Sequence, residues 1–260
     1  MVPVIIAARG RNLRSGVLIQ SPLIVMPGSA MSRCFALIPA AGSGTRMGGE
    51  RPKQYLTLAG RPVLSHALRT LCLQTQIERV FVVLAPGDRF FAQQDWLEFG
   101  EKMTPLFCGG DSRAASVFNG LLAARDEISA DDWVLVHDAV RPCLAPEVLA
   151  RLLAEVRDEP TGGLLALPFV DTWKRGSADG YVLETANRDN LWQAQTPQMF
   201  RYRLLIEALS ATEPAAATDE ARAIEQLGVR PKLVMGDSRN LKITYPQDLA
   251  LAEMILKSME

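Results

Sequence analysis

The chain has 260 residues, which is enough for one α/β domain of ordinary size with a full core or for two small domains. Hydrophobic residues make up 48% of it and the net charge is −1, so composition predicts no attraction to nucleic acid or to a membrane surface. No apolar run reaches the roughly 18 residues that a membrane-spanning helix needs, and we expect neither a nucleic-acid nor a membrane partner.

The first thirty residues differ from the rest of the chain. They carry Arg9, Arg11 and Arg14 and no acidic residue. We favour an upstream start with Met31 as the functional first residue, because the regular pattern begins at Cys34 with no linker before it. An Arg-rich, acid-free leader is also typical of an organelle transit peptide, and this alternative stays open. We expect residues 1–30 to be a disordered or non-native extension and residues 31–260 to form a single domain.

From residue 34 onward, apolar strand-like runs alternate with helical patterns. Buried strands are predicted by five apolar runs, at 34–40, 79–85, 104–109, 133–139 and 163–169. Helices are predicted by apolar spacing at 62–71, 113–124 and 146–156. This order predicts a Rossmann-like α/β fold, with a mostly parallel sheet and helices on both faces. Ligands bind at the carboxyl ends of such strands, so the polar residues after Pro39, Cys108 and His137 should converge on one crevice.

The segment 170–197 breaks this pattern. Its centre is rich in Gly, Ser and Asp, and its arms alternate with polar residues instead of being continuously apolar. It predicts a protruding β-hairpin arm. After it we expect helices at 200–210 and 218–228, with Thr218 as N-cap and Gly228 as C-cap. A strand at 231–236, the segment LKIT at 241–244 and a last helix from about Pro246 complete the chain.

The four cysteines, Cys34, Cys72, Cys108 and Cys143, lie far apart in the sequence and form no CxxC pair. They are typical of reduced thiols in or near a core, and we expect a cytoplasmic protein. A zinc site would need closely spaced ligands, which the two histidines do not supply.

The strongest chemical signal is PAAGSGTRMGGERPKQY, which spans residues 39–55 directly after the first strand. Glycines let backbone N–H groups turn inward and surround phosphate oxygens. Arg46 and Lys53 can then neutralise the charge of a triphosphate. The segment lacks both the Walker spacing and the third glycine of a dinucleotide-binding fingerprint. We therefore predict a nucleoside triphosphate site of another kind.

This segment resembles the signature of sugar-nucleotide pyrophosphorylases and cytidylyltransferases. Six further motifs narrow the resemblance: GGDSRAASV (109–117), VLVHDAVRP (134–142), DTWKR (171–175), NRDNLWQAQTPQMF (187–200), ATDEA (217–221) and NLKIT (240–244). Together they resemble the 2-C-methyl-D-erythritol 4-phosphate cytidylyltransferase family of the non-mevalonate isoprenoid pathway, over about residues 33–258. The resemblance implies transfer of CMP from CTP to that alcohol phosphate, with release of pyrophosphate.

The resemblance also implies a role for particular residues. The catalytic cations would be Arg46, Lys53 and Lys242. The CTP site would include Pro39, Ala40, Ala41, Gly42, Gly44, Gly110, Asp111, Ser116 and Ala139. The alcohol phosphate would be surrounded by Asp138, Arg141, Thr172, Arg188 and Thr218. The hairpin at 170–190 carries Arg188 and would reach into a neighbouring subunit, which implies a homodimer.

Some of these residues have a second interpretation. Asp111 or Ser112 is also placed to cap a helix, which is compatible with a base-binding role. Asp138, at a strand end, suits contact with Mg²⁺, although we expect most of the magnesium ligands to be triphosphate oxygens. His137 is expected to be structural.

The mechanism implied needs no strong base, because the attacking substrate phosphate is already an anion. It attacks the α-phosphorus of CTP in line with pyrophosphate, and the protein positions the reactants and disperses negative charge. Three alternatives remain open: a ribitol 5-phosphate cytidylyltransferase, a sugar-1-phosphate nucleotidylyltransferase with another base, and a non-catalytic nucleotide-binding protein on the same fold. Loss of Arg46 or Lys53 would favour the last, and both are present.

Overall fold

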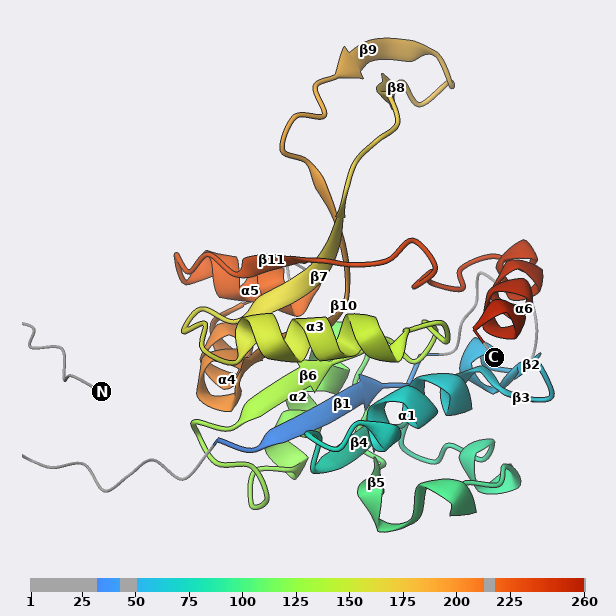
Figure 1. Ribbon diagram of the computed structural model, residues 1–260, viewed down its shortest axis with the longest axis vertical. Helices are drawn as coiled ribbons and strands as arrows, with labels where there is room; N and C mark the ends of the chain where they lie inside the picture. The colour runs from blue at the N-terminus through green and yellow to red at the C-terminus, as the bar shows by residue number, and fades with distance from the viewer. Residues whose placement is uncertain (1–31, 43–50, 213–217, 260) are drawn as a thin grey trace, which may run out of the picture. The chain divides into compact units, whose positions relative to one another are not determined.

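The computed structural model describes residues 32–42, 51–212 and 218–259. The expected extension at 1–30 lies outside this range. Within it, the centre of the fold is a seven-stranded sheet in the order β11-β7-β10-β6-β1-β4-β5 (Figure 1). Its strands are β1 (Cys34–Pro39), β4 (Arg79–Val83), β5 (Met103–Leu106), β6 (Trp133–Val136), β7 (Gly163–Pro168), β10 (Trp192–Arg201) and β11 (Lys232–Met235). Only the two described pairings of β10 are antiparallel, so the predicted mostly parallel sheet is confirmed.

Helices cover both faces of this sheet because its side chains alternate. Ala36 and Ile38 of β1 pack in one apolar cluster with α1 (Val63–Leu73) and α3 (Pro146–Val156). Phe35 and Leu37 point to the opposite face. There they pack with three helices, α2 (Arg113–Ala123), α4 (Tyr202–Ala211) and α5 (Glu220–Gln226). Helices on both faces were predicted, and the arrangement brings the loops after β1, β5 and β6 to one edge.

The prediction for 170–197 was wrong only at its end, from Trp192 onward. Strands β8 (Trp173–Gly176) and β9 (Val182–Ala186) do form a separate antiparallel pair with mostly exposed side chains (Figure 1). Strand β10, however, lies inside the central sheet, and residues 195–200 are buried. Its polar side chains are buried with partners: the Gln195 amide donates to the Asp237 carbonyl, and the Gln198 amide donates to the Asp219 carboxylate. The polar residues of β10 therefore led the sequence analysis to assign the start of a central strand to the exposed arm.

Helix α5 begins one residue later than its sequence suggested. Its N-cap is Asp219, whose carboxylate accepts a hydrogen bond of 2.9 Å from the Arg222 N–H, so the predicted Thr218 cap is wrong. Gly228 follows the C-cap at a φ of +77°, a conformation that favours glycine. The segment 241–244 has no regular structure, and α6 (Gln247–Ser258) follows Pro246.

The remaining short elements connect the sheet to its helices. They are β2 (Thr57–Leu58), β3 (Arg61–Pro62) and the 3-10 turns η2 (Lys53–Tyr55), η3 (Phe91–Gln93) and η4 (Leu97–Lys102). A small apolar cluster, which we call the connecting cluster, joins Leu58, Val63, Val140, Ile243 and Ala252. Among the described residues, no helix combines the length and hydropathy required to cross a membrane.

Candidate active site

A cleft of about 530 Å³ opens at the carboxyl ends of β1 and β6 and at the start of α2. The loops after Pro39, Cys108 and His137 line it, so the predicted convergence is confirmed. The predicted CTP residues that line it are Pro39, Ala40, Ala41, Gly42, Gly110, Asp111, Ser116 and Ala139, and the other predicted residues there are Lys53, Asp138 and Lys242. Gly44 and Arg46 lie outside the described residues.

The glycine-rich segment is held in place by contacts that the sequence did not reveal. The side-chain amide of Gln54, buried in η2, donates to the Ala40 carbonyl (2.7 Å) and the Gly42 carbonyl (3.0 Å). At Gly109, a Cβ would lie 2.2 Å from the Cβ of Ala41, so only glycine allows the loops after β1 and β5 to approach this closely. Gln54 belongs to the RPKQY motif, which is the one signal that could have singled it out.

The start of α2 forms another part of the cleft wall. Of the two cap candidates, Ser112 is the N-cap, because its hydroxyl accepts a hydrogen bond from the Ala115 N–H (3.0 Å). The buried Ser116 hydroxyl accepts from the Gly110 N–H (3.1 Å) and donates to the Ser112 carbonyl (2.9 Å). Ser116 therefore fixes the shape of the Gly110 loop, while the exposed Asp111 remains at the cleft surface.

Asp138 lies at the base of the cleft among three cations. One carboxylate oxygen is 2.7 Å from Arg113 Nε, and the other is 2.8 Å from Lys242 Nζ and 3.7 Å from Arg141 Nε. Burial alone would raise the pKa of Asp138, but the charges of Arg113, Lys242 and Arg141 outweigh it and hold the pKa well below its usual range. Asp138 is therefore an anion whose main effect is to fix the positions of these cations.

Arg113 is a functional residue that the sequence reasoning missed. Besides Asp138, it binds Glu220 in a bidentate pair, at 2.6 and 3.1 Å, and only 1% of Glu220 is exposed. The guanidinium thus joins α2, the end of β6 and the first turn of α5. It lies in the motif GGDSRAASV, but its partner Glu220 is 107 residues away in the chain.

Asp138, which was expected to contact magnesium, is already paired. Both of its carboxylate oxygens already bind cationic side chains. Among the described residues, no group of three or more His, Cys, Asp or Glu side chains could hold a metal ion. The described residues of the cleft therefore supply no cluster of metal ligands, and the expected contact of Asp138 with Mg²⁺ stays a prediction.

His137 is buried beneath the cleft and both of its ring nitrogens are occupied. Nε2 lies 3.2 Å from the Arg141 carbonyl, and Nδ1 lies 3.0 Å from the Thr196 hydroxyl, which itself accepts from the Asp138 N–H. Because the Arg141 carbonyl can only accept, Nε2 carries the hydrogen, and in the neutral ring Nδ1 accepts from the Thr196 hydroxyl. Burial lowers the pKa of His137 to about 4, and the structural role expected of it agrees with this geometry.

This histidine predicts an acid-dependent loss of stability. Its pKa is lower in the folded than in the unfolded chain, where it is about 6.5, so the unfolded chain takes up the proton first as the pH falls. The contribution of His137 is complete above pH 6.5 and is lost toward about pH 4, with a slope of up to about 1.4 kcal/mol per pH unit. We expect His137→Gln to flatten the pH dependence of the free energy of unfolding between pH 6.5 and 4.

Urea titrations across this pH range measure that slope. His66, whose pKa is also lowered by burial, remains in the variant, so the slope should decrease without vanishing. An unchanged slope in His137→Gln would contradict the neutral buried ring.

Four predicted substrate residues do not line the described cleft. Arg141 is buried and donates from Nη1 to the Asn240 carbonyl at 2.6 Å. Within this chain its guanidinium is also an ion-pair partner of Asp138. Thr172 and Arg188 are exposed beside β8 and β9, where Arg188 donates to the Val170 carbonyl. Thr218 is exposed just before α5. The two predicted lysines, in contrast, are brought together, since Lys53 Nζ donates to the carbonyl of Ile243, which follows Lys242 (3.1 Å).

Comparison with known proteins gives a consistent result. The family model described as 2-C-methyl-D-erythritol 4-phosphate cytidylyltransferase matches residues 34–258. Two curated relatives with that name, from Nitrosospira multiformis and Dechloromonas aromatica, are 58% and 57% identical over 230 and 228 residues. Each alignment covers 88% of this chain and 99% of the relative.

Solved structures agree with the sequence relatives. A crystal structure of a 4-diphosphocytidyl-2C-methyl-D-erythritol synthase is 40% identical with a TM-score of 0.78, and the match covers 88% of this chain and 100% of that one. The 2-C-methyl-D-erythritol 4-phosphate cytidylyltransferase of Francisella tularensis is 33% identical with a TM-score of 0.74, covering 86% and 100%.

Proposed function

Because the chain belongs to the 2-C-methyl-D-erythritol 4-phosphate cytidylyltransferase family, we propose that the cleft between Lys53, Lys242 and the start of α2 is where it carries out that family's reaction. The chain is a nucleotidyltransferase of isoprenoid precursor biosynthesis. It transfers CMP from CTP to 2-C-methyl-D-erythritol 4-phosphate and releases pyrophosphate. The observation that supports this assignment of the cleft is the meeting of two lysines with a glycine-containing loop at the strand ends.

The chemistry follows from the charges in the cleft. The phosphate of the alcohol substrate is the nucleophile; its oxygen bonds to the α-phosphorus of CTP while the bond to pyrophosphate breaks. Negative charge builds up on the phosphoryl oxygens, and the ammonium groups of Lys53 and Lys242 are placed to stabilise it. Lys242 has three N–H donors, so it can keep its contact with Asp138 and still donate to a phosphate oxygen. We propose that Arg46, outside the described residues, acts on the same charge.

We propose that the cytosine base lies against the loop of Gly110 and Asp111. Ser116 and the capped start of α2 fix this loop, so its backbone groups and the Asp111 carboxylate can present constant partners to the amino edge of a pyrimidine. A bound base that lacks the matching donor would leave polar groups of this loop buried and unpaired. Such a base is therefore strongly disfavoured.

A panel of the four nucleoside triphosphates tests this proposal. With 2-C-methyl-D-erythritol 4-phosphate held at saturation, CTP should give by far the highest kcat/KM for pyrophosphate release, while UTP, ATP and GTP should be used poorly. Comparable values for UTP and CTP would contradict the assignment of the base to this loop.

We propose that magnesium enters this cleft with the nucleotide and is held by triphosphate oxygens. Bound there, it would neutralise part of the phosphate charge. This proposal rests on the cationic surroundings of Asp138, whose two carboxylate oxygens already pair with Arg113 and Lys242.

We propose that the chain acts as a homodimer in which residues 170–190 of each subunit reach the other subunit's cleft. The support is that Arg188, Thr172 and most side chains of β8 and β9 are exposed, including Tyr181, Val182 and Leu183, which a monomer would leave in water. Sedimentation at assay concentration should give a dimer. Arg188→Ala should raise the KM for the alcohol phosphate more than the KM for CTP, and a fully active monomer would contradict the proposal.

We also propose a cytoplasmic location. All four cysteines are free thiols, and burial raises the pKa of Cys34 and Cys143 to about 12, so these two are unreactive. Reduced thiols of this kind are typical of proteins in a reducing compartment.

A further inference from the structure

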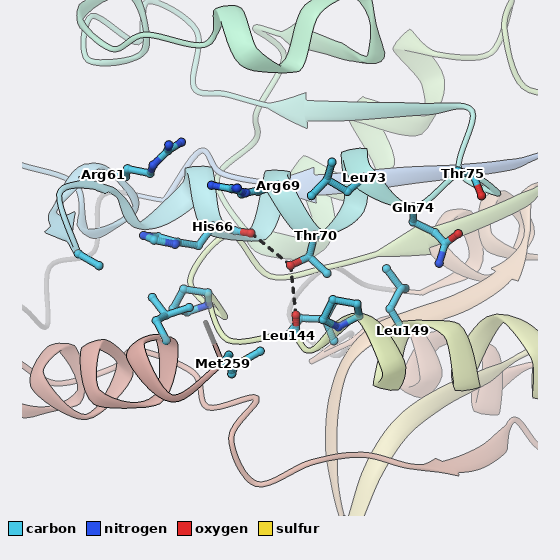
Figure 2. A pocket seen from close by; sticks show the side chains of 14 residues that line it. Arg61, His66, Arg69, Thr70, Leu73, Gln74, Thr75, Leu144, Leu149 and Met259 are labelled. Atoms are coloured by element: carbon cyan, nitrogen blue, oxygen red, sulfur yellow. Dashed lines mark hydrogen bonds between the residues drawn. The ribbon is translucent and has the colours of Figure 1, made fainter.

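A second pocket of about 500 Å³ lies between α1, the start of α3 and the end of α6 (Figure 2). None of its lining residues lines the substrate cleft. Its wall is largely apolar and is formed by Leu73, Pro142, Leu144, Pro146, Leu149, Leu256 and Met259. A hydrogen bond of 3.1 Å from the Thr70 hydroxyl to the Leu144 carbonyl joins two sides of this wall.

The rim of this pocket is cationic. Figure 2 shows Arg61, His66 and Arg69 together at one side of it, and both arginines contribute to lowering the pKa of His66. Arg61 pairs with Glu98, whereas Arg69 forms no ion pair or hydrogen bond with any described residue. None of the described residues that line the pocket is acidic. An apolar cavity with an arginine at its mouth is complementary to a molecule with an apolar chain and an anionic head.

The two cavities share structural elements. Three segments leave the substrate cleft and continue into the wall of the second pocket: the chain from Lys53 to Arg61, the loop from Asp138 to Leu144, and the chain from Lys242 to Met259. The connecting cluster packs between them. Its member Val140 lines the substrate cleft, and Leu256 and Met259, which pack against it, line the second pocket. The Ile243 N–H donates to the Val140 carbonyl (2.9 Å), which ties two of these segments together.

We propose that this pocket binds a small amphipathic anion, with an apolar chain against Leu144 and Leu149 and a phosphate or carboxylate head against Arg69, and that its occupancy changes the rate of reaction in the substrate cleft. A ligand that spreads the pocket would displace the connecting cluster and, with it, the backbone that positions Lys53 and Lys242. Coupling between two sites requires such a shared element with more than one arrangement.

Calorimetric titration with octyl phosphate, octanoate, 1-octanol and inorganic phosphate tests binding. Octyl phosphate or octanoate should bind, and the difference between them identifies the preferred head group. 1-Octanol and inorganic phosphate should each bind about tenfold more weakly, because 1-octanol lacks the anionic head group and inorganic phosphate lacks the apolar chain. Equal binding of 1-octanol would overturn the role of the cationic rim, and no binding of either amphipathic anion would overturn the proposal.

Variants locate the site. Arg69→Gln and Leu73→Glu change exposed side chains at the pocket, and each should weaken binding about tenfold while leaving kcat/KM without ligand within about twofold. The control Arg125→Gln, another exposed arginine, should bind like the unmodified chain. Unchanged binding in Arg69→Gln would place the ligand elsewhere and overturn the proposal.

Kinetics test the coupling. Saturating octyl phosphate or octanoate should change kcat/KM for CTP about fivefold in the unmodified chain, but not in Arg69→Gln. Inhibition that is competitive with CTP and equally strong in Arg69→Gln would show binding in the substrate cleft and overturn the proposal. An unchanged rate at saturation would overturn it as well.

Discussion

Replacing Lys53 with alanine is expected to lower kcat by on the order of 10²–10³, which is typical for the loss of one preorganised donor to a developing charge. The ammonium group lies in the cleft, and its position is fixed by η2 on one side and by its hydrogen bond to the Ile243 carbonyl on the other. In the variant, water would take the place of the ammonium group. Water must reorient as the negative charge develops, so it stabilises the transition state less than the fixed ammonium group does. Initial rates of pyrophosphate release at saturating substrates measure the effect.

The matched control for this substitution is Lys257→Ala. Lys257 lies on α6 and pairs with Glu253 on the surface, so its loss should change kcat by less than about twofold. Arg46→Ala should fall in the same range as Lys53→Ala. Near-normal turnover in both Lys53→Ala and Arg46→Ala, with correctly folded protein, would contradict the assignment of charge stabilisation to these residues.

The largest expected effect on stability comes from Arg113→Met. This substitution leaves Glu220, which is 1% exposed, without its bidentate partner and removes one of the cations around Asp138. Removing one member of a buried ion pair typically costs about 3–5 kcal/mol, because an uncompensated charge is left inside the protein. We therefore expect the free energy of unfolding in urea to fall by about that amount.

The double variant Arg113→Met/Glu220→Gln separates this explanation from a loss of packing. It removes the unpaired carboxylate charge, so it should be more stable than Arg113→Met alone. Measuring Glu220→Gln as well completes the double-mutant cycle, which gives the coupling energy between the two residues. If the double variant is no more stable than the single one, the cost lies in packing and not in the unpaired carboxylate.

Much of this fold could be predicted because its signals are local. Each parallel strand is a short apolar run that can be recognised without knowing its neighbours, and the order of strands and helices then fixes where their carboxyl ends meet. For this reason Lys53, Asp138, Lys242 and the loop at Gly110 could be assigned to one cleft from the sequence.

The parts that could not be predicted depend on partners distant in the chain. Strand β10 looks polar, but its buried glutamines have distant hydrogen-bond partners, the Asp219 carboxylate and the Asp237 carbonyl. Arg113 becomes important through Glu220, and Gln54 through the carbonyls of the glycine-rich segment. The helix cap shifted to Asp219 because either of two adjacent residues can cap a helix, and local sequence does not choose between them.

Pyrophosphate release with CTP and each of two alcohol phosphates tests the central claim most directly. With 2-C-methyl-D-erythritol 4-phosphate, the chain should release one pyrophosphate for each CTP consumed and form a product that carries CMP. Ribitol 5-phosphate should support little release under the same conditions. Faster release with ribitol 5-phosphate, or no release with 2-C-methyl-D-erythritol 4-phosphate, would contradict the account.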